Sequence, residues 1–229
     1  MATLNDVMDY AKFYTGTDEP PRFCREHFDL NGKLFVATDD FKLAQKLTSD
    51  TKENVVLHHF EHDTKQNRLL VNNLADRELH GKAFAVASPD FSVDSKNCWS
   101  CLNECNILKS RIYAYRWQNE CEERVILTLL WGADKATYKW AFGNVEKGSI
   151  VAVSSQAVAD ASVFENGIRA GIDMIQPEYI CWYGKVFDFM ANYYDMSRIV
   201  KMQTLTELLQ LYRKKCKSEK DFEPQLFSA

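Results

Sequence analysis

The sequence has no long hydrophobic run and no strong excess of charge of either sign. No apolar stretch approaches the roughly 18 residues that a membrane-spanning helix needs. The amino terminus, MATLNDVMDY, is mixed and acidic, whereas a secretory signal is basic and then apolar. We therefore expect a cytoplasmic protein without a membrane partner, in which the seven cysteines are reduced.

Several common functional motifs are also missing. The chain contains no phosphate-binding Gly-x4-Gly-Lys-Ser/Thr, no Gly-x-Gly-x-x-Gly, no Gly-x-Ser-x-Gly and no His-Glu-x-x-His. These absences argue against standard ATPases, dehydrogenases, serine hydrolases and zinc proteases. The net charge of −4 over 229 residues is mild, which argues against a general binder of duplex DNA.

Apolar residues are plentiful, and they are spread along the whole chain. They make up 46% of the sequence and include five Trp, ten Tyr and fourteen Phe, enough for a sizeable core. No repeat, linker or low-complexity segment divides the chain. We expect a single domain over residues 1–229, with a frayed tail from 217 to 229.

The pattern of apolar residues predicts strands that alternate with helices. The predicted strands are Leu34–Thr38, Asn54–Phe60, Ala83–Ala87, Val125–Leu130, Ile150–Val153 and Tyr179–Tyr183, with a weaker one at Thr137–Phe142. The predicted helices are Leu4–Tyr14, Phe41–Leu47 with Asp40 as N-cap, Asn97–Gln118, Ala161–Ile175 and Met202–Tyr212. Arg68–Val71 is predicted to form a hairpin with the strand at Asn54–Phe60. This order is typical of an α/β fold with a mostly parallel sheet, either open or an incomplete barrel.

Asp90 is the centre of the predicted site, because it follows the apolar run Ala83–Ala87 in the stretch Lys82–Ser92. The carboxyl ends of parallel strands meet at one edge of a sheet, where α/β proteins bind ligands. Other residues at predicted strand ends are Asp39, Trp131, Ser154, Ser155, Tyr183 and Lys185. Asp90 would serve as a general base or metal ligand. The alternative is that Asp90 caps the following turn and Trp131 belongs to the core.

Two further groups contain metal-binding residue types. Cys98, Cys101 and Cys105 have a spacing that could hold zinc or an iron–sulfur cluster, but Cys101 and Cys105 share an apolar helix stripe with Leu108, which favours a core role. His58, His59 and His62 could bind a transition metal. On a strand, however, neighbouring side chains point to opposite faces, which favours an ordinary polar hairpin. We therefore predict no metal site in these groups, and a divalent metal at Asp90 stays open.

An ordered series of short motifs runs through the middle of the chain. It comprises Pro89-Asp90-Phe91-Ser92, Asn106 with Arg111, Trp131, Phe142-Gly143, Gly148-Ser149 before Val151–Ser154, Phe164 with Gly167, and Pro177, Ile180 and Tyr183-Gly184. Over roughly residues 82–186 this series resembles a domain-of-unknown-function family found mainly in bacteriophages and integrative elements of Firmicutes and gut bacteria. The cysteine-rich start of the Asn97–Gln118 helix departs from that pattern. The resemblance implies a phage or mobile-element origin, hence the host cytoplasm, but supplies no activity.

Two functions are consistent with these observations. The first is a ligand-binding or catalytic site for a nucleotide or nucleic acid at the strand ends. Its catalytic residue would be Asp90, and its ligand-binding residues would be Ser92, Arg111, Trp131, Ser154, Tyr183 and Lys185. The second is a non-catalytic phage protein that binds and modulates a host or defence protein, because Tyr and Trp are frequent interface anchors. A pocket lined by Asp90 and Tyr183 would favour the first function, and an exposed patch of Trp99, Trp117, Tyr193 and Tyr194 would favour the second.

Overall fold

A parallel β-sheet forms the centre of the protein. The computed structural model describes residues 19–60, 78–93, 100–156 and 158–222. Within these residues the sheet has seven strands, all parallel, in the same order as in the sequence. They are β1 (Leu34–Ala37), β2 (Val55–His58), β3 (Ala85–Ala87), β4 (Val125–Thr128), β5 (Val151–Ser154), β6 (Ile180–Tyr183) and β7 (Ile199–Lys201). The predicted α/β fold with a mostly parallel sheet is confirmed.

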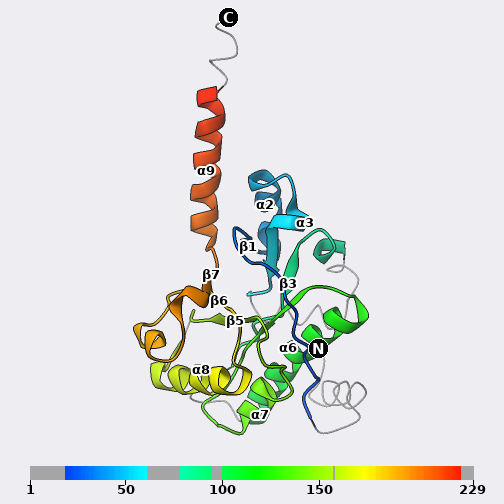
Figure 1. Cartoon of the computed structure of the whole chain (residues 1–229), viewed down its shortest axis with the longest axis vertical. Helices are drawn as coiled ribbons and strands as arrows, with labels where there is room; N and C mark the ends of the chain where they lie inside the picture. The colour runs from blue at the N-terminus through cyan, green and yellow to red at the C-terminus, as the bar shows by residue number, and fades with distance from the viewer. Residues whose placement is uncertain (1–18, 61–77, 94–99, 157, 223–229) are drawn as a thin grey trace, which may run out of the picture.

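The helices lie between the strands in sequence. They are α2 (Phe41–Leu47), α3 (Thr51–Asn54), α6 (Ser100–Glu120), α7 (Thr137–Phe142), α8 (Ala161–Ile175) and α9 (Leu205–Phe222), with short 3₁₀ turns η1 (Thr38–Asp40), η2 (Asp188–Asn192) and η3 (Met196–Arg198). Because every crossover moves one strand further in the same direction and with the same hand, the helices gather on one face of the sheet. The sheet therefore curls into a half-barrel with helices outside (Figure 1).

Both faces of the sheet are buried, which explains the continuous apolar runs of its strands. On β2, Val55 and Leu57 join the larger outer core together with residues of α2, α6, α7 and α8. Val56 points to the inner face, where most of the neighbouring strand residues are small. The inner core contains Phe35, Ala85, Ala87, Ile126, Ala152 and Cys181, and it is covered by Leu30 and Met202.

A hydrogen bond to a side chain links the first strand to the residues that follow the last strand. The backbone N–H of Phe35 in β1 donates to Oε1 of Gln203, which follows β7, at 2.7 Å. A strand edge carries unpaired backbone groups, and this amide satisfies one of them. In a closed barrel the first and last strands would be joined by backbone hydrogen bonds. Here a hydrogen bond from the backbone to a side chain links the two edges.

One predicted strand is wrong, because Thr137–Phe142 forms helix α7. β4 pairs directly with β5, with Leu127 opposite Val151, so the sheet leaves no place for another strand between them. Thr137, Ala141 and Phe142 are buried at a spacing that suits one side of a helix. The short alternating pattern of this segment was compatible with both structures.

The other departures concern chain ends and caps. Strand β7 was not predicted, and Met202, expected in the last helix, is instead a buried residue just before α9. Asp40 occupies the N-cap position of α2, but its side chain makes no capping hydrogen bond. The predicted helix at 4–14 and the second strand of the predicted hairpin, at 68–71, lie outside the described residues. The first strand of that hairpin corresponds to β2, which pairs in parallel with β1 and β3.

Helix α9 extends away from the half-barrel beside α2 (Figure 1). Lys215 of α9 donates to the carbonyl oxygen of Lys46 at the end of α2, at 2.8 Å. Thr204 and Glu207 form a reciprocal capping box at its start, with Thr204 N donating to Glu207 and Glu207 N donating to Thr204 Oγ1. Of the helices in the described part of the chain, none is long and apolar enough to cross a membrane.

Candidate functional site

A cavity of about 600 Å³ opens at the carboxyl ends of strands β3 to β6. Its lining comes from the segments that follow these strands, from Phe60 after β2 and from the start of α8. The lining residues are Phe60, Asp90, Phe91, Ser92, Val93, Leu129, Leu130, Trp131, Ser154, Gln156, Val158, Ala159, Asp160, Val163, Phe164 and Tyr183. The carboxyl edge of the sheet, where the site was predicted, therefore contains a cavity, and Asp90 lines it.

Asp90 is positioned by a network of buried hydrogen bonds that begins at the end of β3. The Ser88 hydroxyl lies 3.0 Å from that of Ser110 on α6 and accepts from the backbone N–H of Thr128 at 2.8 Å. Two residues later, the backbone N–H of Asp90 donates to the carbonyl oxygen of His59 at 3.2 Å. The segment that carries the carboxylate is therefore fixed to β2, β4 and α6.

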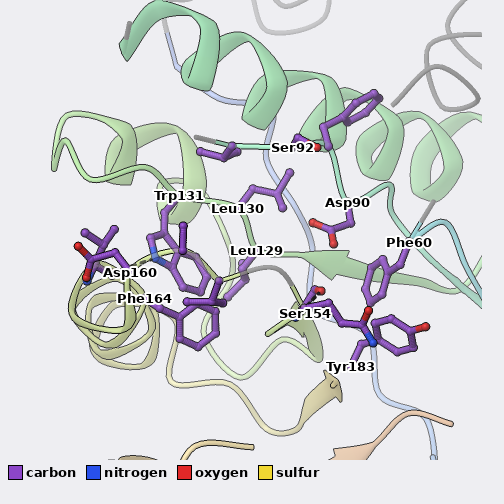
Figure 2. Close-up of a pocket in the computed structure, with 16 residues that line it drawn as sticks. Phe60, Asp90, Ser92, Leu129, Leu130, Trp131, Ser154, Asp160, Phe164 and Tyr183 are labelled. Carbon is purple, nitrogen blue, oxygen red and sulfur yellow. Dashed lines mark hydrogen bonds between the residues drawn. The ribbon is translucent and has the colours of Figure 1, made fainter. Parts of the chain in front are cut away.

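Two pairs of aromatic rings face each other across the cavity (Figure 2). On one side, the Trp131 and Phe164 rings have centroids 5.1 Å apart, and the Trp131 indole N–H donates to the carbonyl oxygen of Val163 at 3.3 Å. On the other side, Phe60 and Tyr183 meet edge to face at 5.4 Å. Asp90 and Ser154 lie between these pairs (Figure 2).

Helix α8 can lie close to Trp131 only because Gly167 has no side chain. A Cβ added to Gly167 would overlap atoms of the Trp131 indole ring. The same approach brings the first turn of α8 to the cavity. Asp160, the N-cap of α8, accepts from the backbone N–H groups of Ser162 at 2.9 Å and Val163 at 3.2 Å.

Among the described lining residues, the charged groups are the carboxylates of Asp90 and Asp160. Burial, with smaller contributions from Asp40 and Glu207, raises the pKa of the Tyr183 phenol further above its ordinary value of about 10, so the phenol is neutral at physiological pH. The tyrosine hydroxyl can therefore donate as well as accept a hydrogen bond.

Five of the seven predicted site residues line this cavity. They are Asp90, Ser92, Trp131, Ser154 and Tyr183. Lys185 does not line it. The Lys185 side chain is exposed, while its backbone carbonyl accepts from Ser155 Oγ at 2.7 Å and from Trp182 Nε1 at 3.1 Å.

Arg111 also lies away from the cavity, buried between α6, the end of α7 and the amino-terminal segment. Its guanidinium donates to the carbonyl oxygens of Pro21, Ala141 and Gly143. Burial lowers the pKa of Arg111 to about 9. It is thus a structural cation, and the predicted ligand-binding role does not fit its position.

The prediction missed Phe60, Asp160 and Phe164 as lining residues. Phe60 is the last residue of the predicted strand Asn54–Phe60, so the same strand-end rule would have found it. Asp160 immediately precedes a predicted helix, the usual position of a capping residue. Phe164 faces both the core and the cavity, a double role that periodicity alone does not reveal.

The described members of the cysteine and histidine groups are not among the residues that line the cavity. Cys105 is buried with Leu108 and Ile112 beneath Trp140, whereas Cys98, His62 and the Cys101 side chain lie outside what the structure describes. His59 Nε2 lies 2.9 Å from His80 Nε2, and His80 Nδ1 lies 3.0 Å from Glu123. A search of the described residues finds no group of three or more His, Cys, Asp or Glu that could hold a metal ion.

Comparison with known proteins identifies similar sequences. The profile of a domain of unknown function, DUF4417, matches residues 21–203. The Gene 1 protein of Mycobacterium phage L5 is 34% identical over 106 residues, which are 44% of this chain and 45% of the phage protein. The chain thus spans less than half the length of that relative. No solved structure matches. The phage resemblance is confirmed, but the match begins far before residue 82, where the motif series suggested its start.

Proposed function

The chain belongs to the DUF4417 family, and we propose that it binds a ligand with a nucleobase-like ring, free or within a nucleic acid, in the Asp90 cavity. The main observation behind this proposal is the lining of the cavity. Two pairs of aromatic rings lie on opposite sides of it, and the Asp90 carboxylate lies between them (Figure 2).

The aromatic pairs supply the binding surface. Stacking of a base on an aromatic side chain contributes about 1–3 kcal/mol, and every base has a face that can stack. Trp131 and Phe164 offer one such surface, and Phe60 and Tyr183 offer the other. A cavity of about 600 Å³ lies in the size range of small-molecule sites.

Asp90 supplies the polar contact. Its carboxylate can accept hydrogen bonds from ring N–H or amino groups, and it can remove a proton from a bound substrate as a general base. Ser154 and the neutral Tyr183 hydroxyl add groups that both donate and accept. We propose Asp90 as the residue on which both binding and any reaction depend.

Of the described aromatic residues that would favour a protein-binding role, Trp117 is not exposed, and Tyr193 and Tyr194 are only partly exposed. The hydroxyls of Tyr193 and Tyr194 are bonded to Glu165 and to the carbonyls of Pro177 and Glu178. Trp99 lies outside the described residues. A modulator of a host or defence protein is the second candidate, and the observation that favours it is the exposure of Leu205, Leu209 and Leu211 on the projecting helix α9.

Calorimetric titration with nucleosides, nucleotides and short single-stranded DNA and RNA tests the first proposal. We expect saturable binding to the wild type and at least a tenfold loss in Asp90→Asn, because about 1.4 kcal/mol of lost hydrogen bonding has that effect. The control is Asp173→Asn, which removes an exposed carboxylate on α8 and should bind like the wild type. If no ligand of the panel binds, or if Asp90→Asn and Asp173→Asn behave alike, the proposal is wrong.

A further inference from the structure

The segment that leaves β2 contributes to the candidate site in two ways. The carbonyl oxygen of His59 accepts from the backbone N–H of Asp90 at 3.2 Å, and the next residue, Phe60, lines the cavity. The His59 imidazole packs instead against Trp117 of α6, with ring centroids 5.2 Å apart. An interaction that fixes the His59 side chain therefore also fixes the backbone that positions Asp90 and Phe60.

We infer that His80 is a positioning residue of the Asp90 site and that it acts through His59. Nε2 of His80 lies 2.9 Å from Nε2 of His59, and Nδ1 of His80 lies 3.0 Å from Oε2 of Glu123. His80 comes before β3 and Glu123 before β4, so these contacts join the end of β2 to the segments that lead into the next two strands. The effect on ligand affinity rests on the proposed function, whereas the effect on the Asp90 backbone does not.

The carboxylate of Glu123 sets the direction of these hydrogen bonds. A carboxylate only accepts, so Nδ1 of His80 donates to Oε2 of Glu123. In the neutral form of His80, Nε2 then has a lone pair and accepts from the Nε2–H of His59. Burial, with smaller contributions from His80 and His58, lowers the pKa of His59 well below 6.5, so at neutral pH this imidazole carries only the proton that it donates.

The surroundings make these hydrogen bonds hard to replace. His59 and His80 are 3% and 4% exposed, and the side chain of Glu123 is 13% exposed. The Trp117 ring lies against both imidazoles, with its centroid 4.6 Å from that of His80. Water therefore has little access to a donor or acceptor that loses its partner, and such a loss is costly.

Loss of the His80 side chain should therefore affect the site, although His80 is not among the described lining residues. Without its acceptor, the Nε2–H of His59 would be buried and unpaired, and the imidazole would turn towards another partner. That turn would move the His59 carbonyl away from the Asp90 N–H and shift Phe60. Binding sites depend on side chains held to within about 0.5 Å, so shifts of this kind weaken binding.

Native-state hydrogen exchange tests the positioning without any ligand. His80→Phe keeps a flat ring beside Trp117 but removes both hydrogen bonds. We expect its Asp90 amide to exchange at least about tenfold faster relative to the Ser88 amide than in the wild type. The Ser88 N–H donates to the carbonyl oxygen of Ile126 at 2.9 Å, so it reports on the sheet itself.

Two comparisons separate positioning from a general loss of stability. Ile175→Val removes a methyl group from the outer core and should change the exchange of Asp90 and Ser88 alike. Glu123→Gln keeps an oxygen that can accept from His80, so its Asp90 amide should stay close to the wild-type rate, whereas Glu123→Ala should act like His80→Phe. If His80→Phe does not fold, the two Glu123 variants carry the same test.

Calorimetry with the panel of nucleosides, nucleotides and short single strands tests the consequence for binding. We expect His80→Phe and Glu123→Ala to bind at least about fivefold more weakly than the wild type. Glu123→Gln and Ile175→Val should stay within about twofold of it.

The outcomes separate this inference from the function on which part of it rests. If the Asp90 amide keeps its protection in His80→Phe and in Glu123→Ala, or if Ile175→Val exposes it equally, His80 does not position the site. If exchange accelerates while Asp90-dependent affinity is unchanged, the link from His80 to binding is wrong and the proposed function stands. If nothing in the panel binds the wild type while exchange changes as expected, the proposed function fails and the positioning of the Asp90 backbone stands.

Discussion

The rings of His58 and Tyr183 have centroids 5.2 Å apart, although three strands separate β2 from β6 in the sheet. Phe60 contacts both rings, at 5.0 Å from His58 and 5.4 Å from Tyr183. The curl of the sheet therefore brings distant strands together across its inner face, and these three rings fill the carboxyl end of the half-barrel. The Asp90 cavity lies beside this cluster, and Phe60 and Tyr183 line one side of it.

Acid should destabilise the protein through His58 and His59. Burial lowers the pKa of His58 from 6.5 to about 3, and burial together with the neighbouring imidazoles lowers the pKa of His59 as well. The unfolded chain takes up protons below pH 6.5, while these folded imidazoles remain neutral. Stability is therefore complete above pH 6.5 and falls as the pH drops from there towards 3, by up to about 1.4 kcal/mol per pH unit for each histidine.

Urea unfolding at several pH values measures this slope, and His58→Phe assigns part of it. Nδ1 of His58 is buried without a hydrogen-bond partner, so a phenyl ring keeps the packing and removes the proton uptake. The acid slope should decrease by about one proton. His27→Gln, which removes an exposed imidazole, should leave the slope largely in place because the buried pair remains. An unchanged slope in His58→Phe would contradict the assignment.

Gly167→Ala should destabilise the protein and impair the cavity together. The new methyl group would overlap the Trp131 indole, which must then move into the cavity or displace α8. Overpacking of this kind costs about 1–3 kcal/mol. In Gly171→Ala, on the same helix, the methyl group would meet Cε1 of Phe142 at 3.2 Å, a much milder contact. Chemical unfolding should give Gly167→Ala a clearly lower free energy of unfolding than Gly171→Ala. Equal values would show that the Trp131 ring can move aside at no cost in stability.

Arg111→Met should be strongly destabilising, with an expected loss of about 3 kcal/mol in the free energy of unfolding. The substitution keeps much of the side-chain volume but leaves the carbonyls of Pro21, Ala141 and Gly143 without their donor. Arg116→Met, which removes a partly exposed ion pair with Glu120, should cost less than about 1 kcal/mol. If Arg111→Met unfolds like the wild type while losing ligand binding, Arg111 belongs to the site and not to the scaffold.

Gln203→Met should loosen the junction between the first and last strands. Methionine has a similar length but cannot accept the Phe35 N–H well, so a loss of about 1–3 kcal/mol is expected. Hydrogen exchange gives a local measurement, because the Phe35 amide should exchange faster relative to the other amides of β1. Gln210→Met, on the exposed side of α9, serves as control. Unchanged protection of Phe35 would show that the bond contributes nothing.

The fold was predictable from the sequence where strands are buried on both faces. The runs at Val125–Leu130 and Ile150–Val153 are apolar without alternation, and they became β4 and β5. Strand β7 escaped notice because Ile199–Lys201 has only three residues and neither apolar side chain is fully buried. Segment Thr137–Phe142 was assigned wrongly, since six residues are too few to distinguish helical from strand periodicity.

The sequence predicted that the candidate site lies at the carboxyl edge of the sheet, but it did not predict which side chains contact one another there. Asp90, Trp131, Ser154 and Tyr183 were found because parallel strands end on the same side. Arg111 could not be placed, because helix α6 is buried on more than one side and its sequence does not show which side faces the ligand. The hydrogen bonds of Asp160 to the start of its own helix are a local detail that the position of strand ends does not reveal.

The order of the strands also bears on how the chain is made. Each strand pairs with the one that precedes it in sequence, so no strand must be inserted between two that have already met. As the chain leaves the ribosome, the sheet can grow at one edge, and each new contact closes only the loop made by the latest crossover. Each pairing still requires a whole crossover segment, for example from Val86 to Val125, and parallel pairing of this kind slows folding. The long-range bond from Gln203 to Phe35 requires residues that lie on either side of all seven strands in sequence, so it can form only after the whole sheet has been synthesised.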